Sequence, residues 1–216
     1  MTNALKTIAP PFNADRLLKT KLSSSLWTDS NDFLFRTKII LEETEYLSLS
    51  FNSKICVDIL MAIECDLKSL IISLSHKNES PEDAYLVARK KGHDIVKLYE
   101  EVEKRAKYRL KLLPKIARTK LIDKFVKLTV SNRYKLVTIL KVQNEDHIDK
   151  MLGLGKYSSV LDINYIDSFL PVPFDLHKIA KQSLDKNLGK IGMKGSEVKK
   201  YYDRIKKFEE SIGKNL

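Results

Sequence analysis

Apolar residues recur every three or four positions between residues 55 and 74, which is the spacing of one face of an α-helix. The members of this stripe are Cys56, Ile59, Leu60, Ile63, Leu67, Leu70, Ile71 and Leu74. Glu64 and Lys68 border the stripe one turn apart, in the order that favours a helical ion pair. The pattern predicts a long amphipathic helix that packs against a core.

Helix-capping residues follow this stripe. Ser80 before Pro81 is typical of an N-cap followed by proline at the first helical position. That helix should end near Lys91, because Gly92 can take the left-handed conformation that closes helices. Asp94 is placed to cap the next helix. The sequence therefore predicts two further helices, separated by a sharp break at Gly92.

The rest of the chain also favours helices. Trp27, expected as a packing anchor, precedes a cap-like cluster at residues 29–32, after which a helix is expected. Residues 135–142 suit a strand or a helix, and we expect a helix. Further helices are predicted at 33–47, 174–188 and 196–212, with an irregular segment between Gly153 and Pro173. The expected fold class is all-α.

Three segments resemble the HEPN family of small helical bundles, which occur in toxin-antitoxin pairs, phage-defence proteins and partners of nucleotidyltransferases. Residues 62–70, Ala-Ile-Glu-Cys-Asp-Leu-Lys-Ser-Leu, are similar to the family's Ala-x-Glu-x-x-Leu-Lys-x-Leu stretch. Residues 92–98, beginning Gly-His-Asp, are similar to its His-Asp-Leu segment, and Asn132-Arg133-Tyr134 to an Arg-Tyr pair before the last bundle helix. The resemblance covers roughly residues 30–145.

This resemblance implies an antiparallel helical bundle and sets the expected division of the chain. We expect an N-terminal lead-in at residues 1–29, a HEPN-like bundle at 30–150, and a linker with a C-terminal helical extension at 151–216. Members of the family usually pair, which implies a homodimer. The apolar stripe of the helix expected at 196–212 could close the bundle or form a dimer seam.

Many HEPN proteins are metal-independent ribonucleases that carry an arginine followed, after four to six residues, by a histidine. No arginine here has a histidine at that spacing, and the nearest pair, Arg89 and His93, is one residue too close. The two would share a face if the helix ran through Gly92 and would diverge if it stopped there. The candidate catalytic residues are thus Arg89, His93 and Arg133, while His93 is also explained as a buried or capping side chain.

Positive charge is concentrated between Lys104 and Lys141, where thirteen Lys and Arg residues stand against one acidic residue, in a chain with a net charge of +11. Apolar residues alternate with these cations, and Pro114 should break or kink the helical segment. Such a surface would attract phosphates. The candidate nucleic-acid-binding residues are Arg105, Arg109, Lys111, Arg118, Lys120, Lys124 and Arg133. An acidic protein partner or a merely solvated face would explain the charge as well.

Other chemistry lacks support in the sequence. The four histidines and two cysteines do not fall at metal-ligand spacing, so neither a metal nor a cofactor is expected. Cys56 and Cys65 are too far apart on one helix for a disulfide. The chain has no apolar run long enough for a membrane span and starts without a signal-peptide pattern. We therefore expect a cytoplasmic protein with no membrane partner.

These patterns predict a non-enzymatic or degenerate HEPN-like module that binds RNA or a protein partner through a basic helical surface, in a toxin-antitoxin or anti-phage setting. One alternative is a divergent, metal-independent HEPN endoribonuclease. Another is an accessory subunit that binds a nucleotidyltransferase. The sequence leaves open whether the protein is an enzyme.

Overall fold

The computed structural model describes residues 13–43, 49–107, 110–114, 117–119, 121 and 170–188. These residues form helices and connections, with no strand among them. The helices are α1 (Ala14–Glu43), α2 (Leu49–Ser73), α3 (Pro81–Lys90), α4 (Ile95–Ala106) and α10 (Pro171–Leu188). The all-α prediction is confirmed for this part of the chain.

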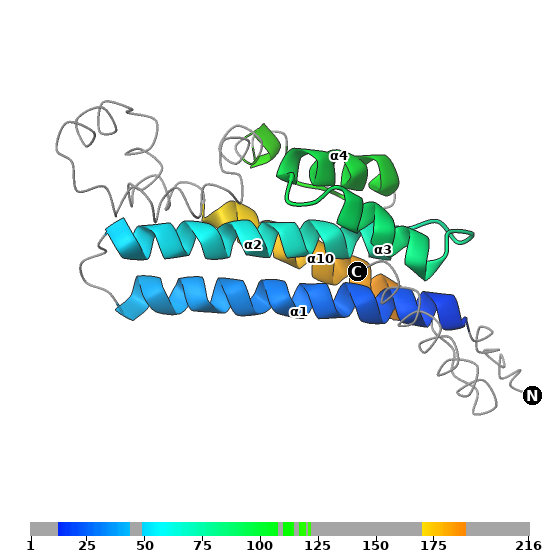
Figure 1. The fold of residues 1–216 in the computed structure, drawn as a ribbon, viewed down its shortest axis with the longest axis horizontal. Coiled ribbons are helices and arrows are strands. Elements are labelled where there is room, and N and C mark those ends of the chain that lie inside the picture. The colour runs from blue at the N-terminus through cyan, green and yellow to red at the C-terminus, as the bar shows by residue number, and fades with distance from the viewer. Residues whose placement is uncertain are drawn as a thin grey trace, which may run out of the picture.

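The frame of the molecule is an antiparallel pair of long helices, α1 and α2 (Figure 1). Helix α10 packs against both members of the pair, running in the same direction as α2. The shorter helices α3 and α4 lie over the C-terminal part of α2, and α3 also contacts α1 (Figure 1). Helix α2 is therefore the central element, in contact with every other named helix.

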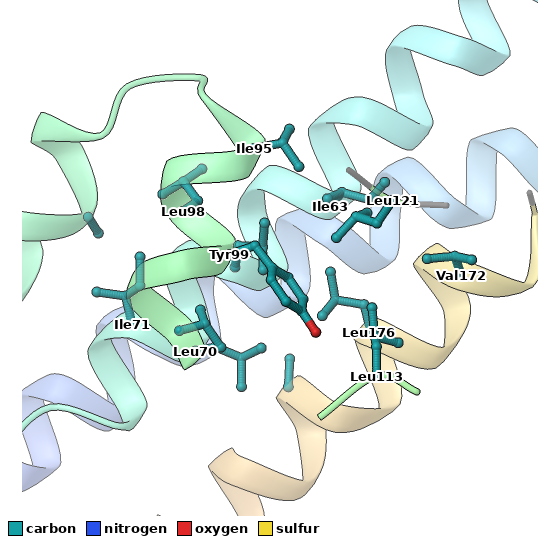
Figure 2. Packing of buried hydrophobic residues seen from close by; sticks show 14 of the residues in the cluster. Ile63, Leu70, Ile71, Ile95, Leu98, Tyr99, Leu113, Leu121, Val172 and Leu176 are labelled. Carbon is teal, nitrogen blue, oxygen red and sulfur yellow. The ribbon is translucent and has the colours of Figure 1, made fainter. Parts of the chain in front are cut away.

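The core forms where α2, α4 and α10 meet. Ile63 and Leu70 of α2, Leu98 and Tyr99 of α4, and Leu176 of α10 are all fully buried (Figure 2). Burial of an aliphatic side chain of this size contributes about 1.5–3 kcal/mol. All eight residues of the predicted stripe on α2 are buried, so that prediction is confirmed.

Local capping signals act as predicted at both ends of α3. The Ser80 hydroxyl accepts a hydrogen bond of 3.0 Å from the Asp83 amide, and Pro81 opens the helix. Gly92 follows the C-cap with φ +61°, the left-handed conformation that glycine adopts without steric cost. The Asp94 carboxylate then accepts a 3.0 Å bond from the Lys97 amide and begins α4.

The expected start of the first long helix is wrong. Helix α1 begins at Ala14 and continues through residues 29–32, where a new helix start was expected. Its first turn is capped by Asn13, whose side-chain oxygen accepts a 2.7 Å bond from the Arg16 amide. The segment 14–29, expected in a lead-in, is thus part of the bundle.

The helix predicted at 174–188 is confirmed as α10, which begins at Pro171. Its buried residues Val172, Leu176 and Ala180 belong to the same core as those of α2. This part of the C-terminal third is therefore a member of the bundle and not an extension beside it. The irregular segment was expected to reach Pro173, which is wrong, because residues 171–173 form the first turn of α10. The rest of that segment, residues 153–169, and the helices expected at 135–142 and 196–212 lie outside the described residues. None of the described helices has the length and apolar character needed to cross a membrane.

Candidate functional site

Two of the segments that resemble the HEPN family, residues 62–70 and 92–98, meet at the α3–α4 junction, residues 91–94. Gly92 reverses the chain direction after α3 and leaves His93 between the two helices. The His93 Nδ1 atom lies 2.7 Å from Oε2 of Glu64 on α2. The junction is therefore joined to the central helix by a polar contact as well as by the buried Ile95.

Glu64 is held from two sides. Its Oε1 accepts a 2.7 Å bond from the Lys68 ammonium, which confirms the predicted helical pair, while Oε2 accepts the bond from His93. The Glu64 side chain is 7% exposed, whereas the His93 ring is 53% exposed. An ionised carboxylate only accepts hydrogen bonds, so Nδ1 of His93 carries the proton in this contact. Nε2 is then the ring nitrogen left for an outside partner.

Arg89 is exposed in the last turn of α3. The left-handed conformation at Gly92 ends the helix between Arg89 and His93, so the two side chains do not continue one helical face. Of the two alternatives left open by the sequence, a helix that continues through Gly92 or one that stops there, the structure has the second. Arg133, the third candidate catalytic residue, lies outside the described residues.

The expected exposed position of Arg105 is wrong. Its side chain is 8% exposed and makes two bonds to Glu79, of 2.8 and 2.9 Å, and one of 2.8 Å to Glu101. A fourth bond of 3.1 Å reaches the Ile71 carbonyl at the end of α2. Arg105 is thus a buried cross-link of α4, α2 and the α2–α3 connection, and its charge is compensated within the protein.

Arg118 is also paired with an acidic residue. Its guanidinium donates bonds of 2.6 and 2.9 Å to the two oxygens of Glu103 and lies 5.8 Å from the centre of the Tyr99 ring. Because Glu103 precedes the basic segment by one residue, a charge count that began at Lys104 excluded it. Arg118 therefore adds less to a positive surface than the sequence suggested.

The remaining basic candidates fall into two groups. Lys111 is exposed and lies with Pro114 in the non-helical residues 110–114. These residues separate α4, which ends at Ala106, from helical residues at 117–119, so the break predicted at Pro114 is confirmed. Arg109, Lys120 and Lys124 lie outside the described residues. Nearer the junction, Arg89 and Lys90 are exposed cations.

A second polar cluster, which sequence reasoning missed, joins α1, α2 and α10. Asp66 is fully buried, and its Oδ1 lies 3.1 Å from Nδ1 of His177. The Ser30 hydroxyl lies 3.2 Å from the same nitrogen. Trp27 stacks on the His177 ring with centroids 4.7 Å apart and donates a 3.3 Å bond to its carbonyl. Trp27 is thus the packing anchor that was predicted.

The Asp66 cluster is not a serine nucleophile with its base. Ser30 and Asp66 both meet Nδ1 of His177, so no ring nitrogen links one to the other as a proton relay requires. Burial raises the pKa of the Asp66 carboxyl, although its hydrogen bond with His177 opposes this. The sequence signal was available, since Asp66 lies three residues after Ile63 and four before Leu70, within the buried stripe.

The described residues contain no group of three His, Cys, Asp or Glu side chains placed to hold a metal ion. Comparison with known proteins adds no relative, because the chain matches no protein-family model, no curated protein and no solved structure.

Proposed function

We propose that this protein is a HEPN-like helical module that binds RNA at the α3–α4 junction and does not cleave it. The contact between Glu64 and His93 carries the proposal. It joins the two segments that resemble the family, residues 62–70 and 92–98, in one place on the surface. The junction presents the half-exposed imidazole of His93, and two exposed cations, Arg89 and Lys90, precede it in the last turn of α3.

The charges around His93 favour an anionic ligand. Arg89 and Lys90 are exposed, and no ion pair with another described residue neutralises either of them. Cationic side chains with free donors bind phosphate oxygens, and such binding weakens as salt rises. Arg105 and Arg118 are paired with acidic residues and contribute to stability instead of to this surface.

The test is the affinity for a fluorescently labelled oligouridylate at increasing salt, measured by anisotropy. We expect the double variant Arg89→Glu, Lys90→Glu to bind more weakly. Its logarithmic salt slope should fall by about 1.4, since each phosphate that a cation neutralises on single-stranded RNA accounts for about 0.7 of the slope. The matched control is Lys38→Glu, Lys178→Glu, which makes the same change of net charge at exposed positions on α1 and α10.

Equal losses in both double variants would mean that total charge, and not the junction, governs affinity, and would refute the assignment. Retention of full affinity in the junction variant would refute it as well. Thermal unfolding of both double variants checks that each remains folded.

A divergent metal-independent ribonuclease is the second candidate, and one observation favours it. Glu64 fixes the ring of His93 through Nδ1, which leaves Nε2 to exchange a proton with a substrate, the arrangement used by catalytic histidines. The ribonuclease hypothesis predicts RNA cleavage in EDTA that is lost in His93→Ala. His76→Ala, at another exposed histidine, is the matched control. The absence of cleavage by the unaltered protein supports binding alone.

A further inference from the structure

A large cavity opens away from the α3–α4 junction, between the first turns of α1, the end of α2 with the connection that follows, and the last turns of α10. Its volume is about 1080 Å³. This volume is slightly larger than the range of roughly 300–1,000 Å³ that is typical of small-molecule sites. A ligand of nucleotide size would therefore fit within it.

Hydrogen bonds between the three elements hold the cavity wall in place. The Ser73 and Ser183 hydroxyls lie 2.7 Å apart, and the Asn187 amide donates a 2.8 Å bond to the Ser73 carbonyl. From α1, the Lys19 ammonium donates a 2.9 Å bond to the His76 carbonyl. Side-chain hydrogen bonds thus fix the cavity wall between α1, the end of α2 with the connection after it, and α10.

The lining is positively charged. Among the described residues that line the cavity, four are cationic, namely Arg16, Lys19, Lys77 and Lys186, and Asp15 is acidic. No ion pair with a described residue neutralises Arg16, Lys77 or Lys186. Burial lowers the pKa of Lys19, and an anion beside it would offset that effect. Cations that converge on a concave surface favour phosphate over neutral ligands.

Apolar and uncharged polar residues complete the lining. Leu74 and Leu110 are buried and contribute to the wall, and Asn78 lies exposed at the α2–α3 connection. A nucleotide needs this combination, since its phosphates require cations while its base requires an apolar or amide-lined surface. We propose that this cavity binds a small phosphorylated ligand of nucleotide size, with Arg16 and Lys186 as contacts to the phosphate. The proposal does not depend on RNA binding at the junction.

Calorimetric titration with ATP, pyrophosphate and adenosine tests the proposal. We expect ATP and pyrophosphate to bind and adenosine to bind at least tenfold more weakly. The double variant Arg16→Gln, Lys186→Gln should weaken ATP binding at least tenfold. The matched control Lys38→Gln, Lys178→Gln removes the same charge at exposed positions outside the lining and should leave the affinity unchanged.

Three results would overturn the proposal: no binding of ATP at millimolar concentration, equal binding of adenosine and ATP, or an equal loss in the two double variants. Thermal unfolding establishes that the cavity variant is folded before its affinity is compared. Affinity of the same variant for the labelled oligouridylate separates the two sites, because it should be unchanged if RNA binds at the junction.

Discussion

The Arg105 guanidinium faces the Glu79 carboxylate in two parallel hydrogen bonds of 2.8 and 2.9 Å. The pair joins α4 to the connection between α2 and α3, and Arg105 also bonds to Glu101 and to the Ile71 carbonyl. All three charged side chains are at most 16% exposed. Removal of the central cation would leave the poorly solvated Glu79 carboxylate without its ion-pair partner, and Glu101 with only Lys91, 3.5 Å away.

We therefore expect Arg105→Ala to lower the free energy of unfolding by about 3–5 kcal/mol, the usual cost of breaking a buried ion pair. Lys104→Ala, at the exposed neighbouring position, should change it by less than about 0.5 kcal/mol. Urea denaturation followed by circular dichroism measures both values. A cost of Arg105→Ala no larger than that of the control would show that the cluster does not stabilise the fold.

Asp66 should make stability depend on pH. Burial raises the pKa of its carboxyl above the ordinary 3.8, so the protonated form is favoured in the folded protein. The resulting stabilisation is complete below pH 3.8 and is lost as the pH rises through the folded-state pKa. Asp66→Asn stays neutral at every pH. The stability of this variant relative to the unaltered protein should therefore increase as the pH rises above 3.8.

Denaturation in urea at several pH values measures this difference for Asp66→Asn. Asp185→Asn, at an exposed carboxylate of α10, is the control, and its difference from the unaltered protein should stay nearly constant. A difference for Asp66→Asn that is equally flat, or that falls with pH, would contradict the prediction.

The two cysteines should be unreactive in the folded protein. Cys56 and Cys65 are free thiols in the core of α2, and burial raises the pKa of each to about 12. Only the thiolate attacks a disulfide reagent, so both a low thiolate fraction and poor access should slow the reaction. Ellman's reagent at mildly alkaline pH should label both thiols quickly in urea and far more slowly without it. Rapid labelling of either thiol in the native protein would disprove its burial.

Lys107 ends α4 in a conformation that suits glycine, with φ 44° and ψ −114°. A side chain in this region costs on the order of 1–3 kcal/mol. Lys107→Gly should therefore raise the free energy of unfolding by about 1 kcal/mol after the added entropy of the unfolded chain is counted. Lys104→Gly, inside the helix, should lower it by about 1 kcal/mol. Thermal melts of the two variants should shift in opposite directions.

Local rules predicted the parts of the fold that depend on neighbours in sequence. The Ser80 cap, the break at Gly92 and the bond between Glu64 and Lys68 each involve residues within four positions of one another or a single backbone conformation. The buried stripe on α2 was equally clear because its apolar residues follow the helical period.

Helix α1 was missed at its N-terminal half because its buried face carries polar residues. Thr20 is buried and its hydroxyl donates a hydrogen bond to the Arg16 carbonyl one turn earlier, while the Ser23 hydroxyl bonds to Ser69 of α2. Hydroxyls satisfied in this way can replace apolar side chains without the penalty of an unpaired group. Hydrophobic periodicity therefore marks only part of that face, at Leu18, Leu22 and Leu26.

The candidate site depended on contacts that no sequence interval reveals. Glu64 and His93 are 29 positions apart, and the pairing of Arg105 with Glu79 spans 26. A charge count along the chain treats acids outside the counted interval as absent, although folding brings them next to its arginines. The net charge counted along residues 104–141 therefore exceeds the positive charge that the described residues of this segment expose, because Arg105 and Arg118 pair with acidic residues outside it.

The packing of α10 against both α1 and α2 has a consequence during synthesis. The hydroxyl of Ser183 reaches Ser73 across 110 positions of sequence. At a translation rate of about 5–20 residues per second, the ribosome needs on the order of 5–20 s to make that stretch. Throughout this interval the nascent α1–α2 pair would lack α10, and Trp27 would be without the His177 ring that stacks on it and open to chaperones.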